Sequence, residues 1–436
     1  MPVQDKQKQT ILKAIGDLGR RVTPADVATK TGLPVLVVQQ ELNKVAFETG
    51  GNMQVGDKGD IVYSFHPGFT NSYLAKGVAA AFVVLGAKLA EVGFYLLRIS
   101  FGIALIASLI TIVVLLLLIA VIVSRGLGSG DDDDRGGGFP IFMPTGGFHF
   151  SFWDWMILRD LFLWDAMTRR PVQYYDYRRP TIRQRSRSNF LLNCFSFLFG
   201  DGDPNEGIDQ KRWQVIAQVI KKNGNVVTAE QLAPYTGADP KDENAVLPVL
   251  VRFNGQPEVT PKGNIIYVFE AMQSTAADQD VHPPAYLQEF PWKFTNIPEG
   301  ELLPVFIVAG LNVAGAWTVW NWFHNQPSLA HSRLMTLVIA LVVYGTLFVT
   351  IPIVRTLLNS LRNKRIEIRN QKRYQHAELV AKPSDKLLNK LAEAQEFRGS
   401  RKITEKDVVY TTEKDALDQP DELSEKFTQK EFDASP

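Results

Sequence analysis

The segment IALIASLITIVVLLLLIAVIV, residues 103–123, contains 21 residues and no charge. As an α-helix with a rise of about 1.5 Å per residue, it is long enough to cross a hydrocarbon core of about 30 Å. Two more apolar segments, 302–323 and 334–354, are separated by ten residues with a single formal charge, at Arg333. The sequence therefore predicts a transmembrane helix over 103–123 and a transmembrane hairpin formed by the two later segments.

A fourth apolar segment, 75–97, carries three charged residues, Lys76, Lys88 and Glu91. Lys88 and Glu91 are three residues apart, so on a helix they share a face and can pair. An ionisable residue inside a membrane is costly and faces protein rather than lipid. We expect this segment to cross the membrane and to meet the next span at a tight turn near residues 98–102. A helix lying on the membrane surface is the alternative.

The distribution of basic residues predicts the orientation. Residues 169–187 contain seven arginines and one acid, and residues 355–373 contain seven basic residues and one acid. Cytoplasmic loops carry such an excess of Lys and Arg. We expect both segments on the cytoplasmic side, together with the N-terminal domain, which shows no signal-peptide pattern. If residues 75–97 do not cross, the N-terminal domain lies on the opposite face.

An internal repeat is the most informative feature outside the spans. Residues 54–65 read QVGDKGDIVYSF and residues 258–269 read EVTPKGNIIYVF, with six identities at a constant offset of 204. Upstream, RRVTPADVATKTGL (20–33) matches NVVTAEQLAPYTGA (225–238) at an offset of 205. A nearly fixed offset over about fifty residues indicates a duplicated structural unit.

Both copies predict the same elements. An amphipathic helix precedes a short Val-rich turn, and Thr23 or Thr228 is the expected N-cap of a second helix. A third helix follows, over 34–48 or 244–253, and then a hairpin whose Lys-Gly-Asp/Asn turn needs a positive φ. Three helices and a hairpin predict two winged-helix (α+β) domains.

The charge balance argues against DNA as the partner of these domains. Residues 1–66 contain eight basic and seven acidic residues, and residues 208–270 contain seven of each. Without a basic face there is little counterion release to drive DNA binding. The third helix of the first copy is apolar where a groove-reading helix is polar and basic. We expect protein–protein contacts instead, through third-helix residues Val37 and Val38 and wing residues Lys58 and Lys262.

The middle of the chain suggests contact with the membrane surface. Residues 150–164 mix aromatic side chains with a few charges, a composition typical of the headgroup zone. The arginines that follow would lie near anionic lipid headgroups. Docking onto a neighbouring subunit is the alternative. The candidate membrane-surface residues are Trp153, Trp155, Trp164, Arg169, Arg170, Arg178 and Arg179.

No pattern of catalytic or metal-ligating residues emerges. The six histidines form no i, i+4 pair, and the chain has no phosphate-binding loop. Asp201, Asp203 and Asn205 have the spacing of a calcium loop, but Glu206 stands where that loop needs glycine, so we expect a turn that caps the next helix. Cys194, the single cysteine, lies in an apolar run and cannot supply an iron–sulfur cluster alone. We expect no cofactor and no enzymatic activity.

The strings FSFLFGDGDPNEGI and RWQVIAQVIKKNGNVVTAEQLAPY resemble a family of cyanobacterial membrane proteins with plastid relatives in plants. The resemblance covers residues 195–270 most closely and implies a thylakoid membrane protein associated with photosystem assembly. Some plant relatives carry an iron–sulfur biogenesis label. The motif defines no catalytic residues, so it implies none here.

The sequence thus predicts an α-rich integral membrane protein with three or four transmembrane helices and two cytoplasmic winged-helix domains. The predicted function is a membrane-anchored adaptor for photosystem biogenesis, whose partners are subunits of a membrane complex, anionic lipid headgroups and a possible second copy, and not nucleic acid. A membrane-tethered transcription regulator and a small transporter subunit are the alternatives. The layout is winged domain 1–70, membrane hairpin 71–124, Gly/Asp-rich linker 125–150, interfacial segment 151–200, winged domain 208–270, linker 271–300, transmembrane hairpin 301–355, basic then helical segment 356–398, and disordered acidic tail 399–436.

Overall fold

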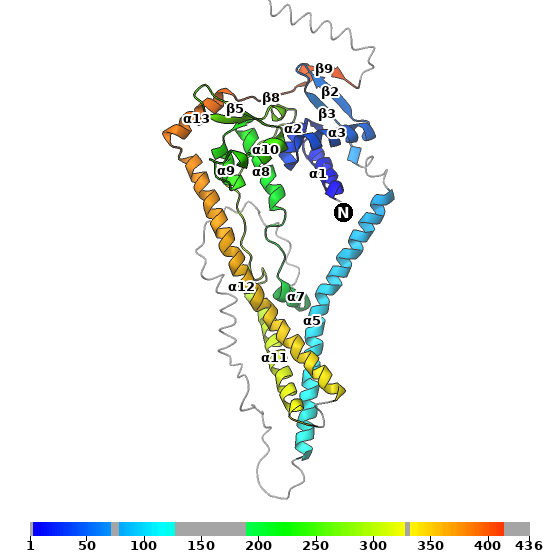
Figure 1. Ribbon diagram of the computed structural model, residues 1–436. Helices are drawn as coiled ribbons and strands as arrows, with labels where there is room; N and C mark the ends of the chain where they lie inside the picture. The colour runs from blue at the N-terminus through cyan, green and yellow to red at the C-terminus, as the bar shows by residue number, and fades with distance from the viewer. Residues whose placement is uncertain (1–2, 71–77, 127–188, 328–331, 414–436) are drawn as a thin grey trace, which may run out of the picture. The chain divides into compact units, whose positions relative to one another are not determined.

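The computed structural model describes residues 3–70, 78–126, 189–327 and 332–413 (Figure 1). The chain divides into two units, each built from segments that are distant in sequence. The repeat unit takes its described residues from 1–85, 205–290 and 366–436, and the helical unit from 86–204 and 291–365. Each unit is described by itself.

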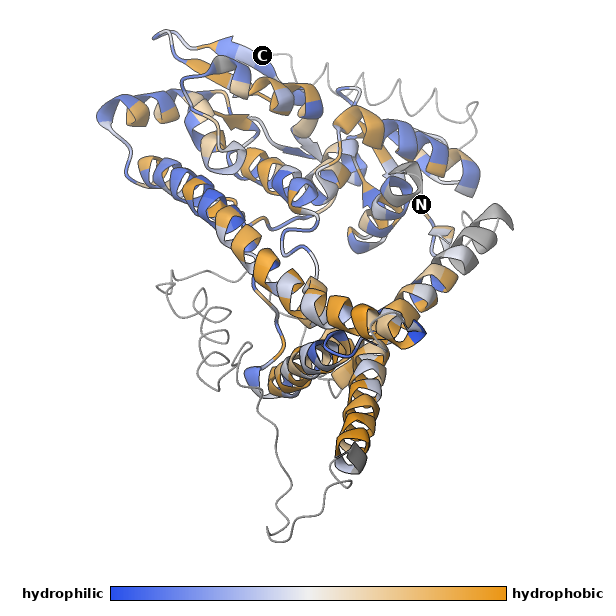
Figure 2. Ribbon diagram, turned by 60° about the horizontal axis from the view of Figure 1, so that its bottom comes forward, coloured by the Kyte–Doolittle hydropathy of each residue, from blue (hydrophilic) through white to orange (hydrophobic). Residues whose placement is uncertain are grey.

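Within the described residues, three helices are long and apolar enough to cross a membrane: α5 (Val78–Gly126), α11 (Glu299–His324) and α12 (Arg333–Ala381). The predicted spans 103–123, 302–323 and 334–354 lie inside them. Figure 2 shows hydrophobic residues along α5 and α11, whereas α12 changes from hydrophobic to hydrophilic towards its C-terminal end. The structure thus confirms a helix-rich chain with three candidate spans.

The predicted turn near residues 98–102, and with it a separate fourth span, is wrong. α5 is one unbroken helix of 49 residues. The stretch RISFG holds no proline, and its one glycine does not end a helix by itself. Arg98 instead packs as a helical residue, with its guanidinium 5.2 Å from the centroid of the Phe94 ring and 5.0 Å from that of Phe195.

Glycines allow the helices of the helical unit to approach closely. A Cβ atom on Gly315 of α11 would lie 2.5 Å from Cγ2 of Ile112 on α5. A Cβ on Gly102 of α5 would lie 2.6 Å from Cα of Leu191 on α7 (Phe190–Phe199). Small residues permit this packing where lipid gives helices no hydrophobic reason to associate.

The α7 helix lies inside the unit, and burial raises the pKa of its Cys194 thiol to about 12, so this thiol is unreactive.

The calcium-like spacing at residues 201–205 belongs to a structural turn. Asp201 accepts hydrogen bonds from the Thr295 hydroxyl (2.9 Å) and the Asn296 amide (2.5 Å). The same turn leads directly into α8 (Ile208–Lys222), as expected: the carbonyl of Asn205 accepts from the Ile208 amide at 3.0 Å, and no side chain caps this helix. Asp201 therefore holds an extended loop of the helical unit.

The two repeats have the same order of elements. Thr23 and Thr228 stand at the predicted N-cap positions: the Thr23 hydroxyl accepts from the Asp26 amide at 3.1 Å, and the Thr228 amide donates to the Gln231 side chain at 3.0 Å. The positive φ angles of the hairpin turns are confirmed, 83° at Gly59 and 81° at Gly263. The first repeat contains α1 (Val3–Asp17), β1 (Arg21–Val22), α2 (Pro24–Thr31), α3 (Val35–Thr49), β2 (Asn52–Gly56) and β3 (Ile61–Ser64). The second contains α8, β4 (Val226–Val227), α9 (Ala229–Thr236), the 3-10 turn η1 (Glu243–Ala245), α10 (Leu247–Phe253), β5 (Gln256–Val259) and β6 (Ile265–Val268).

A single hydrophobic core joins the two repeats. It contains Ile11, Val38 and Leu42 of the first repeat together with Ile216 and Phe253 of the second, all fully buried. Each repeat is therefore half of one folded body and not a separate domain.

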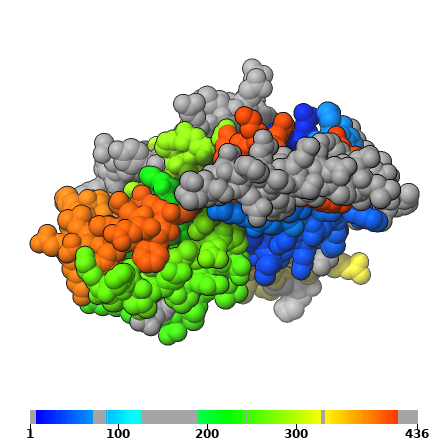
Figure 3. All heavy atoms as spheres, turned by 90° about the horizontal axis from the view of Figure 1, so that it is seen from above, coloured from blue at the N-terminus to red at the C-terminus, as the bar shows by residue number. Residues whose placement is uncertain are grey.

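The C-terminal segment adds a strand to the sheet of the first repeat and forms a separate two-stranded sheet with β7. The prediction of a disordered tail over 399–436 is wrong for its first part. The elements that form there are β8 (Arg401–Lys402), the 3-10 turn η3 (Glu405–Asp407) and β9 (Val408–Thr411). Residues 414–436 lie outside the described part of the chain. β8 pairs in parallel with β7 (Ser274–Thr275), which follows the 3-10 turn η2 (Glu270–Met272) inside the predicted 271–300 linker. β9 extends the first sheet in the order β1-β3-β2-β9, while the second sheet has the order β4-β6-β5. Figure 3 shows this segment, in red, against both repeats.

Candidate partner-binding surface

The third helix of the first repeat, α3, has one buried and one exposed face. Val38, predicted to contact a partner, is 0% exposed and belongs to the shared core, so that prediction is wrong. Val37 is half-buried. The prediction treated the apolar run as a free face, but the second repeat covers part of it.

The exposed face of α3 starts at Leu36 and ends at Phe47. The Leu36 side chain is 57% exposed and that of Phe47 is 90% exposed. Gln40 lies between them at helical spacing, and Lys44, a cation on the same helix, is paired with Glu41 at 3.1 Å. An almost fully exposed phenylalanine leaves about 2 kcal/mol of possible apolar burial unused. Sequence periodicity could have singled out positions 36, 40 and 47 once the other face was known to be buried.

The third helix of the second repeat, α10, packs against α3 and adds exposed apolar side chains. Val251 is 79% exposed, and Leu247 is half exposed. We call Leu36, Phe47, Leu247 and Val251 together the α3–α10 surface. Exposed apolar side chains on two helices that contact each other are the kind of feature that marks a site for binding protein.

Arg252 fixes α10 to the first repeat. Its Nε donates a 2.7 Å hydrogen bond to the carbonyl of Gly32, and its guanidinium lies 4.5 Å from the ring centroid of Trp213. Gly32 ends α2 with a φ of 71°, and a Cβ atom there would lie 2.4 Å from the backbone nitrogen of Gln214. The α3–α10 surface therefore depends on a backbone contact that only glycine permits.

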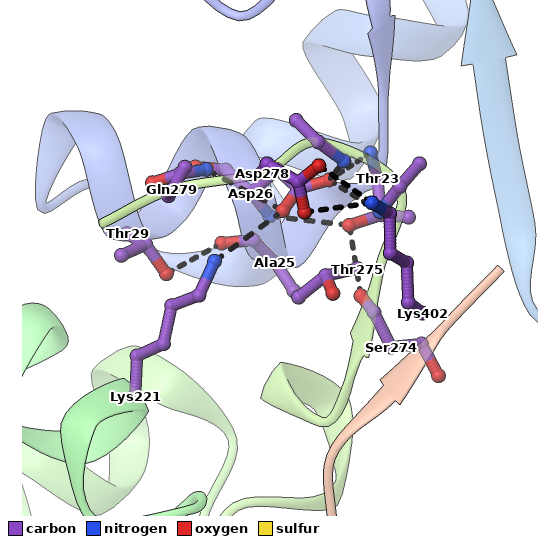
Figure 4. A network of polar contacts seen from close by, with 12 residues as sticks. Thr23, Ala25, Asp26, Thr29, Lys221, Ser274, Thr275, Asp278, Gln279 and Lys402 are labelled. Carbon is purple, nitrogen blue, oxygen red and sulfur yellow. Dashed lines mark hydrogen bonds and ion pairs between the residues drawn. The ribbon is translucent and has the colours of Figure 1, made fainter. Parts of the chain in front are cut away.

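A buried carboxylate, Asp26, connects the first repeat to the chain after the second (Figure 4). Its Oδ2 accepts hydrogen bonds from the amides of Thr23 (3.1 Å), Ala276 (2.8 Å) and Ala277 (3.0 Å). The Thr23 hydroxyl in turn donates to the carbonyl of Ser274 at 2.9 Å. One side chain thus closes the capping box of α2 and holds the segment after η2.

Lys221 of the second repeat points at Asp26 from the opposite side, as Figure 4 shows. Its Nζ lies 3.8 Å from Oδ1 of Asp26 and has no hydrogen-bond partner among the described residues. Burial lowers the pKa of Lys221 below its ordinary value, and the charge of Asp26 opposes that shift. The pair is an ion pair that holds the repeats in register, with the cation satisfied by charge alone.

The two hairpin-turn lysines predicted to contact a partner differ in their surroundings. Lys58 is exposed at the turn of the first hairpin. Lys262 pairs at 3.1 Å with Glu393 of α13 (Asp385–Glu396), and Glu393 also accepts hydrogen bonds from the Thr260 hydroxyl (2.5 Å) and the Asn264 side chain (2.9 Å). These bonds lower the pKa of Glu393 to about 2. The turn of the second hairpin is therefore occupied within the chain.

Acidification is expected to weaken the contact between α13 and the turn of the second hairpin. The folded pKa of Glu393, about 2, lies below its ordinary value of 4.5, so the stabilisation it gives is present above pH 4.5 and is lost as the pH falls towards 2. Hydrogen–deuterium exchange should show faster exchange of residues 260–264 at pH 3 than at pH 6 after correction for intrinsic rates. Glu393→Gln should exchange at the faster level at both pH values. Equal protection of the two proteins at pH 6 would contradict this role for Glu393.

The predicted membrane-surface residues, from Trp153 to Arg179, lie outside the described residues. Among the described residues, no group of three or more His, Cys, Asp or Glu side chains could hold a metal ion. The described part of the chain thus offers exposed apolar side chains on α3 and α10 and buried structural ion pairs.

The chain is similar over nearly its whole length to a plant protein. The Arabidopsis thaliana protein described as "Uncharacterized protein At5g03900, chloroplastic" is 32% identical over 445 residues, which cover 96% of this chain and 81% of the relative. No family model matches the chain, and no solved structure matches it.

Proposed function

Because the chain belongs to the same family as the chloroplastic Arabidopsis thaliana protein At5g03900, we propose that it is a non-enzymatic, thylakoid-membrane adaptor that assists the assembly of photosynthetic complexes. The three candidate spans and the chloroplastic relative are compatible with a thylakoid location. The assembly role rests on the family resemblance of residues 195–270. The observation that carries the adaptor role is the α3–α10 surface, with Phe47 almost fully exposed.

The order of elements in each repeat supports two winged helices used for protein contacts. In a DNA-binding winged helix, the third helix enters the major groove with polar and basic side chains. Here the outer face of α3 presents Leu36, Gln40 and Phe47, and its inner face is buried in the shared core. A helix in this position has neither the charge nor the free surface for a groove. The shared core also requires both repeats to lie on one side of the membrane. With α5 as a single helix, the support for the cytoplasmic side is the basic segment 355–373, which leads into the part of α12 that belongs to the repeat unit.

Substitution of the exposed apolar residues is expected to reduce client capture at least fivefold without loss of stability. The Phe47→Ala, Val251→Ser double variant removes the two most exposed side chains of the surface, and exposed positions contribute within about 0.5 kcal/mol to stability. The measurement is a crosslinked pull-down of the tagged full-length chain from gently solubilised membranes, quantified by mass spectrometry. Enrichment of photosystem subunits by the unsubstituted chain supports the proposal.

Val259→Ser is the matched control, because Val259 is also a highly exposed valine but lies on β5. It should leave the captured set unchanged. Equal capture by the double variant and the unsubstituted chain would reject the α3–α10 surface as the docking site. Sequence-selective binding in a gel shift with the full-length chain would favour the transcription regulator instead, and ion flux in proteoliposomes would favour the transporter subunit.

A further inference from the structure

We propose that the outer edge of β2 is a strand-docking site, which β9 fills within the chain and which an extended segment of a partner fills in its place. The partner segment has the pattern of residues 407–412, DVVYTT: an acidic residue, then β-branched and aromatic residues, then threonines. This site is separate from the α3–α10 surface and does not depend on its function.

The backbone of β2 presents paired hydrogen-bonding groups on its outer side. The amide of Gly56 donates to the carbonyl of Asp60 at 2.8 Å, so Gly56 faces the β2–β3 hairpin. Alternate residues face opposite edges of a strand, so Met53 and Val55 face outwards. The carbonyl of Met53 accepts a 2.9 Å hydrogen bond from the Thr412 amide, and Val55 pairs with Tyr410. Main-chain bonding of this kind is the basis of recognition by strand addition.

β9 is attached by these edge bonds and very little by burial. None of its four residues is buried, and Tyr410 is exposed, whereas Val62 and Tyr63 of β3 in the same sheet are fully buried. An element with few buried apolar contacts opens at low cost in free energy. The edge strand can therefore leave while the rest of the sheet stays folded.

A charge cluster favours an acidic residue immediately before the docked strand. Arg401 pairs with Asp57 at the turn of the hairpin and lies 3.7 Å from a carboxylate oxygen of Asp60 and 3.7 Å from one of Asp407. Asp407 lies just before β9. Its carboxylate also accepts a hydrogen bond from the Thr404 amide at 2.8 Å, and its backbone carbonyl accepts one from the Asp57 amide at 3.1 Å. An incoming segment with an acidic residue at this position would meet the same arginine.

Comparison with the second repeat shows that the residue at one strand position decides whether the outer edge can pair with another strand. The Thr260 amide donates to the Asn264 carbonyl, as Gly56 does to Asp60, so Pro257 faces outwards at the position equivalent to Met53. Proline has no amide hydrogen and blocks the pairing of an edge strand. In the described residues, no strand pairs with the outer edge of β5. The first repeat keeps at this position the donor that the second repeat lacks.

The test uses the full-length chain in detergent and a fluorescent peptide of residues 405–413. Tyr410→Pro removes the amide hydrogen that pairs with Val55 and should release β9. The peptide should then bind this variant at least tenfold more tightly than it binds the unsubstituted chain, because the tethered β9 is absent as a competitor at high effective concentration. Adding Met53→Pro, which copies the second repeat, should abolish the gain. A peptide with proline in place of its tyrosine is the control and should not bind.

Hydrogen exchange at residues 408–412 reports whether β9 is released, and exchange in β3 reports whether the sheet stays folded. If Tyr410→Pro leaves β9 protected, Asp407→Lys provides a second release, because it places a cation beside Arg401. Failure of the released chain to bind the peptide, or binding that Met53→Pro does not change, would overturn the proposal.

Discussion

Replacing Gly32 by alanine is expected to lower the free energy of unfolding of the repeat unit by about 3 kcal/mol or more. Two costs add up at this position. The φ of 71° is left-handed, and the new Cβ would lie 2.4 Å from a backbone atom of α8, which cannot move away as a side chain could. α8 would be pushed away from α2, and the Arg252 bond to the Gly32 carbonyl would be lost with it. Hydrogen–deuterium exchange of α2 and α8 amides in the full-length chain gives the change in opening free energy.

Gly50 offers a matched control for the Gly32 substitution. It ends α3 with a φ of 69°, but no atom of the described residues lies within 4 Å of a Cβ atom placed there. Gly50→Ala should therefore cost only the left-handed backbone penalty, about 1 kcal/mol. If both variants lost the same stability, the close approach of α2 to α8 would not matter energetically.

Replacing Asp26 by asparagine is expected to lower the free energy of unfolding of the repeat unit by about 3 kcal/mol. The carboxylate Oδ2 accepts three amide hydrogen bonds, while Oδ1 faces the Lys221 ammonium. An asparagine can keep its oxygen towards the three amides, but its NH2 group then faces Lys221. A buried cation would be left without its counter-charge, and the junction between the repeats would open. The measurement is the protection of β7 and α2 amides against hydrogen exchange.

A double-mutant cycle with Lys221 separates the charge from the hydrogen bonds. In a Lys221→Met background, Asp26→Asn should cost less, because no cation is left unpaired. Gln231→Ala serves as the control in the second repeat: Gln231 closes the equivalent capping box at 3.0 Å without any charge, so its loss should cost about 1 kcal/mol. If Asp26→Asn lowered the stability by no more than Gln231→Ala does, the central role of Asp26 would be contradicted.

Local features of the fold could be predicted from the sequence. Thr23 caps its helix because a hydroxyl before a helical pattern satisfies a free amide, here that of Asp26, and the Lys-Gly turn fixes each hairpin. The three long apolar helices follow from composition alone. Each of these predictions depends on residues within a few positions of one another.

Features that depend on distant pairing could not be predicted. The apolar face of α3 carries no sign that α10, some 200 residues later, covers it, so the sequence alone makes Val38 look like a surface residue. β9 lies in a polar tail, and its structure comes from the free edge of β2 and from Arg401, not from its own pattern. The turn at 98–102 rests on the expected topology, and no residue there favours a turn. The α3–α10 surface emerges only when the buried half of each helix is known.

The pairing of β2 with β9 also sets the order in which the protein matures. Met53 and Thr412 are 359 residues apart. At a synthesis rate of about 5–20 residues per second, the ribosome needs on the order of 20–70 s to make the strand that completes the first sheet. During part of that interval the first repeat also lacks α8, which contributes to its core, and α5 must enter the membrane. The N-terminal half therefore leaves the ribosome with an unfinished core and an open strand edge, a state that invites chaperone binding.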